Sequence, residues 1–221
     1  RLFEIGRCFA HAASGYQQLT MLGGLAYGGA VAEQWDAARR KVDFYDVKSD
    51  LEALVAPRAT RFEAAQHPAL PPGRAAKLLL DGHQAGWLGE LHPHLQQKYD
   101  LPFAPMIFEL NLDAVTGRKP ASYREFSRQP LVRRDISVEV AEPVRAQAML
   151  DALIKSAPGI VSEVVLFDVY RGKGIDSDKK SVAFRILLQD THRTLTDAEV
   201  EAAIGQLLQV LQEQFKAKLR K

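Results

Sequence analysis

The chain has 221 residues, of which 47% are hydrophobic and 25% are charged, and its formal net charge at pH 7 is +2. This length suits one large domain or two modest ones, and the composition is that of a folded globular protein, which excludes a disordered chain. A net charge so close to zero does not by itself point to nucleic acid. No run of 18 apolar residues occurs, which excludes a membrane-spanning helix.

The cysteine content and the first residues bear on the setting of the protein. The one cysteine, Cys8, excludes a disulfide framework and a multi-cysteine zinc site, and favours a reducing, cytoplasmic setting. We expect Cys8 itself to be a small buried apolar residue of a strand. The segment Arg1–Glu4 has no initiator methionine and no apolar signal core, so we expect the sequence to begin inside a longer chain.

The segment from Thr116 to Pro130 is rich in glycine, proline and serine and poor in aliphatic residues, which is typical of a linker. We therefore predict two domains, residues 1–120 and residues 127–220. The first is predicted to be mixed α/β with antiparallel strand pairs, because Asp81-Gly82 between two apolar runs indicates a hairpin. Its strands are expected over residues 19–27, 42–47, 77–80, 86–89 and 107–112, and its helices over 33–40, 49–54 (capped by Ser49) and 95–99.

The second domain has the clearer pattern. Alternation around Ile136 predicts a strand, helical spacing follows from Ala146 to Ala157, and two strands then flank the Gly172/Gly174 loop. Thr196 and Glu199 form a capping box that opens a second helix. The tail 215–219 fits either a strand or the end of that helix. Taken as a strand, it completes a ferredoxin-like βαββαβ domain, so the fold class is α+β.

Period-two alternation sorts the side chains of this predicted sheet between a face beneath the helices and an open face. The face beneath the helices receives Ile136, Val138, Val140, Val165, Phe167, Val169, Val182, Phe184, Ile186 and Leu188. The open face receives Arg133, Asp135, Ser137, Leu166, Asp168, Tyr170, Ser181, Ala183 and Arg185.

An aromatic ring, a carboxylate, hydroxyls and arginines on an open sheet are typical of a surface that binds unstacked RNA bases. Tyr170 supplies the ring and Asp168 an acceptor for a guanine edge, while basic side chains near the loop supply phosphate contacts: Arg171, Lys173, Lys179 and Lys180. Two other roles stay open, a small-molecule regulatory domain and a subunit-association domain without RNA. The Arg133-Arg134-Asp135 run is either an ion pair within the sheet or an RNA contact.

Four strings of the second domain, in this order, resemble the ferredoxin-fold anticodon-binding domain of the β subunits of bacterial phenylalanyl-tRNA synthetases. They are Pro130–Val138, Leu166–Gly172, Lys180–Phe184 and Arg193–Asp197. Five strings of the first domain are similar to the non-catalytic class II synthetase-like domain of the same family: Arg1–Arg7, Asp43–Lys48, Pro72–Ala76, Gly89–Pro93 and Phe108–Leu110. The resemblance covers nearly the whole chain and implies a C-terminal fragment.

The resemblance implies anticodon contacts at Ser137, Asp168, Tyr170 and Ser181. We further expect Lys180 and Arg185 to contact phosphates. The resemblance also implies tRNA(Phe) and a catalytic α subunit as partners in an (αβ)2 heterotetramer. The enzyme it implies is a cytoplasmic aminoacyl-tRNA synthetase, a ligase that uses ATP and Mg2+. The resemblance places both cofactors outside this fragment. We find no Glu-Arg motif of a class II active site and expect no catalytic residue here.

Some other motifs have a plainer interpretation. His92-Pro93-His94 lacks a third clustered ligand, so we expect turn residues and no metal site. Gly172-Lys173-Gly174 lacks the spacing of a phosphate-binding loop and predicts a hairpin. The sequence does not separate core from interface roles for Trp35 and Trp87.

Overall fold

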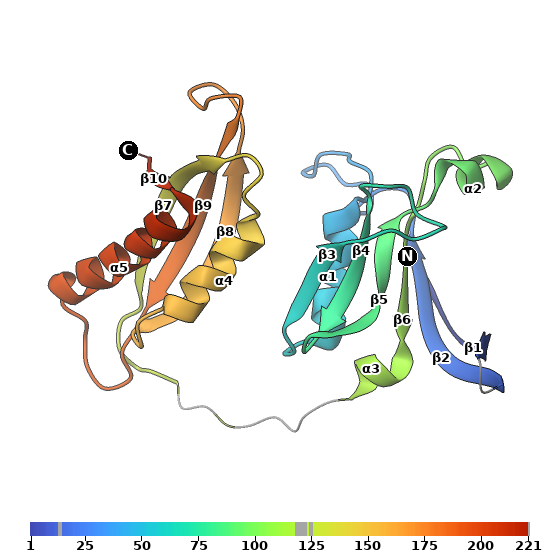
Figure 1. Cartoon of the computed structure of the whole chain (residues 1–221), viewed down its shortest axis with the longest axis horizontal. Coiled ribbons are helices and arrows are strands. Elements are labelled where there is room, and N and C mark those ends of the chain that lie inside the picture. The colour runs from blue at the N-terminus through green and yellow to red at the C-terminus, as the bar shows by residue number, and fades with distance from the viewer. Residues whose placement is uncertain (13–14, 118–122, 124–125, 221) are drawn as a thin grey trace. The chain divides into compact units, whose positions relative to one another are not determined.

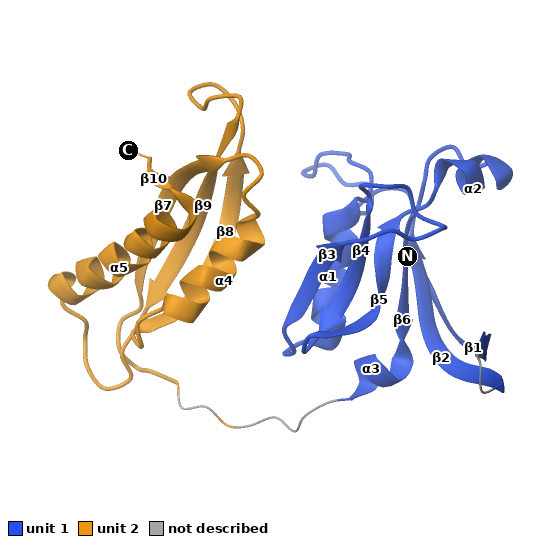
Figure 2. Ribbon diagram, in the orientation of Figure 1, with its two compact units in different colours: residues 1–121 blue, residues 122–221 orange. Residues whose placement is uncertain are grey.

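The computed structural model describes residues 1–12, 15–117, 123 and 126–220. The chain divides into two compact units, residues 1–121 and 122–221 (Figure 2). Part of the predicted linker, residues 118–122 and 124–125, lies outside the described residues.

Unit 1 is built on a six-stranded antiparallel sheet of order β1-β2-β6-β5-β4-β3 (Figure 1). The strands are β1 (Leu2–Ala12), β2 (Gly15–Ala26), β3 (Thr60–Ala64), β4 (Ala75–Leu80), β5 (His83–Glu90) and β6 (Met106–Asn111). The helices are α1 (Phe44–Val55), α2 (Pro93–Lys98) and α3 (Leu112–Thr116). The core lies where buried residues of α1, such as Val47 and Leu51, meet Leu78, Leu88 and Leu110 of the sheet. The predicted hairpin at Asp81-Gly82 is confirmed, with β4 and β5 on either side.

The expected strand over residues 42–47 and the cap at Ser49 are wrong, because helix α1 begins at Phe44. Its cap is Asp43, whose carboxylate accepts from the backbone N–H groups of Tyr45 and Asp46, while Asp46 accepts in return from the Asp43 N–H. This reciprocal pair satisfies the first donors of the helix six residues before Ser49.

The helix expected over residues 33–40 is also absent from the structure, which has turns there. The Ala30 N–H donates to the Arg40 carbonyl at 3.0 Å, so the segment returns on itself. An eight-residue helix would instead hold its ends about 12 Å apart.

Cys8 is exposed, in contrast to the expectation of burial. It lies on the edge strand β1, opposite Leu19 of β2. The neighbouring strand β6 pairs with β2 only from Met21 to Ala26. The hairpin around Cys8 therefore extends beyond the rest of the sheet.

Unit 2 has the predicted βαββαβ order: β7 (Val132–Ala141), α4 (Ala146–Ser156), β8 (Val161–Tyr170), β9 (Lys179–Leu188), α5 (Asp197–Phe215) and β10 (Lys218–Leu219). Its antiparallel sheet has the order β10-β7-β9-β8, and α4 and α5 cover one face (Figure 1). The ambiguous tail resolves into both elements, because α5 continues to Phe215 and β10 then pairs with β7. The α+β fold class is confirmed.

The core of unit 2 lies between the helices and the inner sheet face, and it fixes which face stays open. Phe184 and Ile186 of the central strand β9 are fully buried, as are Met149 and Leu153 of α4 and Leu207 of α5. The predicted capping box is present, since Thr196 Oγ1 accepts from the Glu199 N–H and Glu199 accepts from the Thr196 N–H.

Strand β8 departs from simple alternation, because its register to β9 shifts between Leu166 and Asp168. Phe167 is the extra residue of this bulge, in which two residues of one strand face one residue of the partner. The residues of β8 that precede the bulge therefore lie on the opposite faces from those predicted. Leu166 packs against the core, while Val165 and Phe167, expected beneath the helices, are exposed.

Candidate nucleic-acid interface

The strand register defines cross-strand rows on the open face of unit 2, and three of them hold the predicted contact residues. Glu139, Ser181 and Tyr170 form the row nearest the β8–β9 loop. Ser137, Ala183 and Asp168 form the middle row, and Asp135, Arg185 and Val165 the third. The structure thus brings five of the six predicted contact residues to this face: Ser137, Asp168, Tyr170, Ser181 and Arg185.

Tyr170 ends strand β8, and its ring is held from two sides. Its hydroxyl donates to the Lys173 carbonyl at 3.3 Å, and the residue is 38% exposed. A Cβ added at Gly172 would lie 2.6 Å from the Tyr170 hydroxyl oxygen, so the ring occupies space that only a glycine leaves open. The ring is thereby positioned before any ligand binds.

Asp168 is exposed beside Tyr170 and is free to accept hydrogen bonds. Within residues 126–220, as in the rest of the described chain, no side chain or backbone group bonds to its carboxylate. Asp135, by contrast, is held by two arginines: Arg133 at 2.6 Å and Arg185 at 3.2 Å. Hydrogen bonds from Arg133 and then Arg185 lower the pKa of Asp135 to about 2. Of these two carboxylates, Asp168 is the one available to a ligand.

The two serines form one polar feature. The Ser137 and Ser181 hydroxyl oxygens are 2.9 Å apart, and Ser181 is only 3% exposed. Ser137 therefore presents the more accessible hydroxyl, and Ser181 supports it from the central strand.

Lys180 does not reach the open face, which corrects its assignment as a phosphate contact. It lies opposite Val140, whose side chain is in the core, and is 7% exposed. Its ammonium donates to the Glu142 carbonyl at 2.7 Å. Alternation places neighbouring residues on opposite faces, so Ser181 and Lys180 cannot both face outward.

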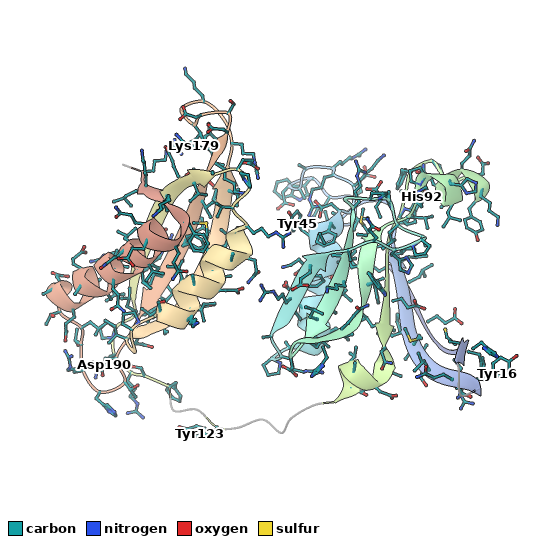
Figure 3. The ribbon with its side chains drawn as sticks, viewed as in Figure 1. Tyr16, Tyr45, His92, Tyr123, Lys179 and Asp190 are labelled. Atoms are coloured by element: carbon teal, nitrogen blue, oxygen red, sulfur yellow. The ribbon has the colours of Figure 1, made fainter. Side chains whose placement is uncertain are left out.

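Two basic side chains near the β8–β9 loop, Arg171 and Lys179, are engaged within the protein. Arg171 bonds to Glu142 at 2.7 Å, and Lys179 bonds to Asp176 at 2.5 Å. Figure 3 shows Lys179 at the loop end of β9 and Asp190 at the other end. The Arg133–Asp135 pair is within the sheet, and Arg134 reaches Glu201 of α5 at 3.5 Å.

Two residues of the open face were missed by reasoning from the sequence. Phe167 is brought there by the bulge, and the Arg185 guanidinium carbon lies 4.9 Å from its ring centre. Arg220 follows β10, and its guanidinium carbon lies 5.4 Å from the centre of the Tyr170 ring. No periodic signal marks the bulge, and the two-residue strand β10 is too short to show alternation.

Unit 1 offers a different kind of surface. Leu2, Phe3 and Ile5 of β1 are exposed and line an apolar cavity of about 570 Å3 together with α1, β2, β6 and α3. Trp35 is exposed, whereas Trp87 packs against His67, with ring centres 5.2 Å apart. His92 caps α2, where its Nδ1 accepts from the His94 N–H (Figure 3).

The described residues hold no group of three or more His, Cys, Asp or Glu side chains that could bind a metal ion. Among their helices, none has the length and apolar character needed to cross a bilayer.

Comparison with protein families assigns both units. Residues 1–112 match the family model for the phenylalanyl-tRNA synthetase beta chain CLM domain, and residues 127–220 match the ferredoxin-fold anticodon-binding domain. The chain belongs to the phenylalanyl-tRNA synthetase beta chain family. The family model that matches residues 1–112 describes a domain of the phenylalanyl-tRNA synthetase beta chain. The second match identifies unit 2 as an anticodon-binding fold.

Curated relatives in the phenylalanyl-tRNA synthetase beta chain family match over all of the chain. A phenylalanine–tRNA ligase beta subunit of Dechloromonas aromatica is 51% identical over 225 residues, and one of Nitrosospira multiformis is 50% identical over 220 residues. One of Ralstonia nicotianae is 48% identical over 238 residues. The chain spans 28% of the length of the first two relatives and 29% of the third.

Proposed function

We propose that this chain is part of a phenylalanine–tRNA ligase beta subunit and binds the anticodon region of tRNA(Phe) through the open face of unit 2. The observation that carries the proposal is the pair formed by Asp168 and Tyr170. An unengaged carboxylate lies beside a positioned, partly exposed ring, on a face where Asp135 is already neutralised by arginines.

Each proposed contact follows from the chemistry of the side chain. An anticodon base stacks on Tyr170, which is worth about 1–3 kcal/mol per base. The Asp168 carboxylate accepts hydrogen bonds from the N–H groups of a guanine edge, and the Ser137–Ser181 pair supplies a hydroxyl. Arg185 keeps guanidinium donors for a phosphate in addition to those that bond to Asp135.

Unit 1 is proposed to support assembly with a catalytic alpha subunit in an (αβ)2 enzyme of the cytoplasm. The exposed apolar side chains of β1 and the adjoining apolar cavity support this role, since contiguous apolar surface marks protein contacts. ATP and Mg2+ then act in the alpha subunit. The contribution of this chain is positional, because a docked anticodon fixes the tRNA so that its 3′ end reaches that active site.

A role in protein association alone is the second candidate, and the exposure of Val165 and Phe167 on the open face favours it. Salt dependence distinguishes the two candidates. Binding of a single-stranded RNA loop weakens with salt by about 0.7 in log K per log salt for each phosphate contacted, whereas apolar association does not.

The test is binding of the 221-residue chain to the anticodon stem-loop of tRNA(Phe), measured across a salt series. We expect binding that weakens with salt and is lowered about 5- to 150-fold by Tyr170→Ala, the range of one stacked base. Tyr99→Ala, at an exposed tyrosine of unit 1, is the matched control and leaves affinity unchanged. Absence of binding, or equal affinity for wild type and Tyr170→Ala, would reject the proposal.

A further inference from the structure

The bulge in β8 gives the open face a second aromatic ring. Phe167 is 45% exposed, although the Arg185 guanidinium already lies 4.9 Å from the ring centre. Arg185 is held in this place by Asp135, which accepts from its Nε at 3.2 Å. The ring therefore keeps accessible surface next to a guanidinium that cannot move freely.

The two rings form a repeated arrangement along one strand. Phe167 lies beside Arg185, and Tyr170 lies beside Arg220, at 4.9 Å and 5.4 Å respectively. Asp168, free to accept hydrogen bonds, stands between the two aromatic residues in β8. Each ring is thus paired with a cation.

The spacing of the rings suits bases that are unstacked from one another. Three residues of an extended strand span about 10 Å. Stacked bases of one strand rise only about 3.4 Å, so two stacked bases cannot occupy both rings. Proteins that read single-stranded loops splay bases apart and stack them separately on aromatic side chains.

We propose that Phe167, with Arg185 beside it, is a second base-stacking position, so that this face holds two neighbouring anticodon nucleotides, one on Tyr170 and one on Phe167. The inference rests on the proposed function. The base on Phe167 covers the exposed part of the ring, and Arg185 donates to the phosphate that joins the two nucleotides. Asp168 reads the edge of the base on Tyr170.

Abasic nucleotides, placed singly at the three anticodon positions of the stem-loop, assign each ring to a base. We expect Phe167→Ala to weaken binding by the 1–3 kcal/mol of a stacked base, about 5- to 150-fold. In the Phe167→Ala variant, an abasic nucleotide at one anticodon position no longer weakens binding further. In the Tyr170→Ala variant, the same holds for an abasic nucleotide at the adjacent position.

Two further variants separate stacking from apolar packing. Phe167→Tyr keeps a ring and retains wild-type affinity, whereas Phe167→Leu keeps apolar bulk without a π-face and binds as weakly as Phe167→Ala. Equal affinity of Phe167→Leu and wild type would overturn the second position and favour an apolar protein contact there. Circular dichroism spectra and Tm values like those of wild type establish that the variants are folded.

The outcomes keep this inference separate from the function on which it rests. If Tyr170→Ala weakens binding and Phe167→Ala does not, the second position is wrong and RNA binding stands. If the same abasic nucleotide stops weakening binding in both variants, the two rings contact one base and the inference fails. If neither variant weakens binding, or the wild-type chain does not bind, both proposals fail.

Discussion

The Arg220 guanidinium carbon lies 5.4 Å from the centre of the Tyr170 ring, although the two residues come from opposite edges of the sheet. The Arg220 backbone is fixed by its N–H, which donates to the Ser137 carbonyl at 2.8 Å. The Arg220 side chain thus extends over the open face to the ring. Ser181, which lies opposite Tyr170, is nearly inaccessible.

Arg220→Gln is expected to weaken binding of the anticodon stem-loop and to flatten its salt dependence. No carboxylate in residues 126–220 bonds to this guanidinium, so it is available to a phosphate. Loss of one phosphate contact lowers the slope of log K against log salt by about 0.7. Lys155→Gln, on the exposed surface of α4, is the control and leaves the slope unchanged. Identical slopes for Arg220→Gln and wild type would show that Arg220 does not contact the RNA.

Gly172→Ala is expected to weaken RNA binding with little change in Tm. The new methyl would lie 2.6 Å from the Tyr170 hydroxyl oxygen, and the ring must move away and give up its bond to the Lys173 carbonyl. Gly159→Ala is the matched control, because a Cβ there meets no atom within 4 Å. In a Tyr170→Ala background the Gly172→Ala change should have no further effect on affinity. A further loss in that background would show that Gly172 acts independently of the ring.

Leu166→Ala should destabilise unit 2 more than Phe167→Ala does. Leu166 packs on the core, and its truncation is expected to cost about 2 kcal/mol, at the low end for buried leucines because it is only partly buried. Phe167 is exposed on the open face, so its truncation leaves the core intact. Denaturant unfolding of the two variants measures the difference. A larger loss of stability in Phe167→Ala than in Leu166→Ala would contradict the placement of the bulge at Phe167.

This pair of residues also marks the limit of what alternation predicts. The pattern assigned β7 and β9 to their correct faces, because hydrophobic residues such as Ile136, Val138 and Phe184 alternate without interruption. In β8 the residues Val165, Leu166 and Phe167 are all apolar, so the sequence carries no contrast that reveals the extra residue. Asp168 and Tyr170 were placed correctly because they follow the bulge.

Capping chemistry was predicted where its residues are unambiguous and missed where two candidates compete. Thr196 and Glu199 stand alone before an apolar helical pattern, and the capping box forms there. Around α1, Asp43 and Ser49 are both acceptable caps, and Asp46 decides between them by bonding back to the Asp43 N–H. Arg220 depends on a tertiary contact that no local pattern encodes.

The capping box of α5 is expected to make stability depend on pH. The Arg193 guanidinium first, and then the bonds from Thr196, lower the pKa of Glu199 to about 2. A carboxylate whose pKa is lowered in the folded state stabilises fully above its unfolded value near 4.5. That stabilisation declines as the pH falls from there toward 2. Glu199→Gln should therefore lower Tm at pH 7 and have a much smaller effect at pH 2.5.

Glu213→Gln, at an exposed position of the same helix, controls for loss of a carboxylate as such. Its effect on Tm should be small at both pH values. A Glu199→Gln effect of the same size at pH 7 and pH 2.5 would show that the carboxylate charge does not contribute.

The pairing of Asp168 with a guanine is tested most directly by a double-mutant cycle on the 221-residue chain and the anticodon stem-loop. One change is Asp168→Asn, and the other replaces the first anticodon guanine by inosine, which lacks the 2-amino donor. A hydrogen bond to a charged group is worth about 1.5–3 kcal/mol, so inosine should weaken wild-type binding about 10- to 150-fold. It should weaken Asp168→Asn binding far less. An equal loss in both proteins would contradict anticodon reading by Asp168 on the open face.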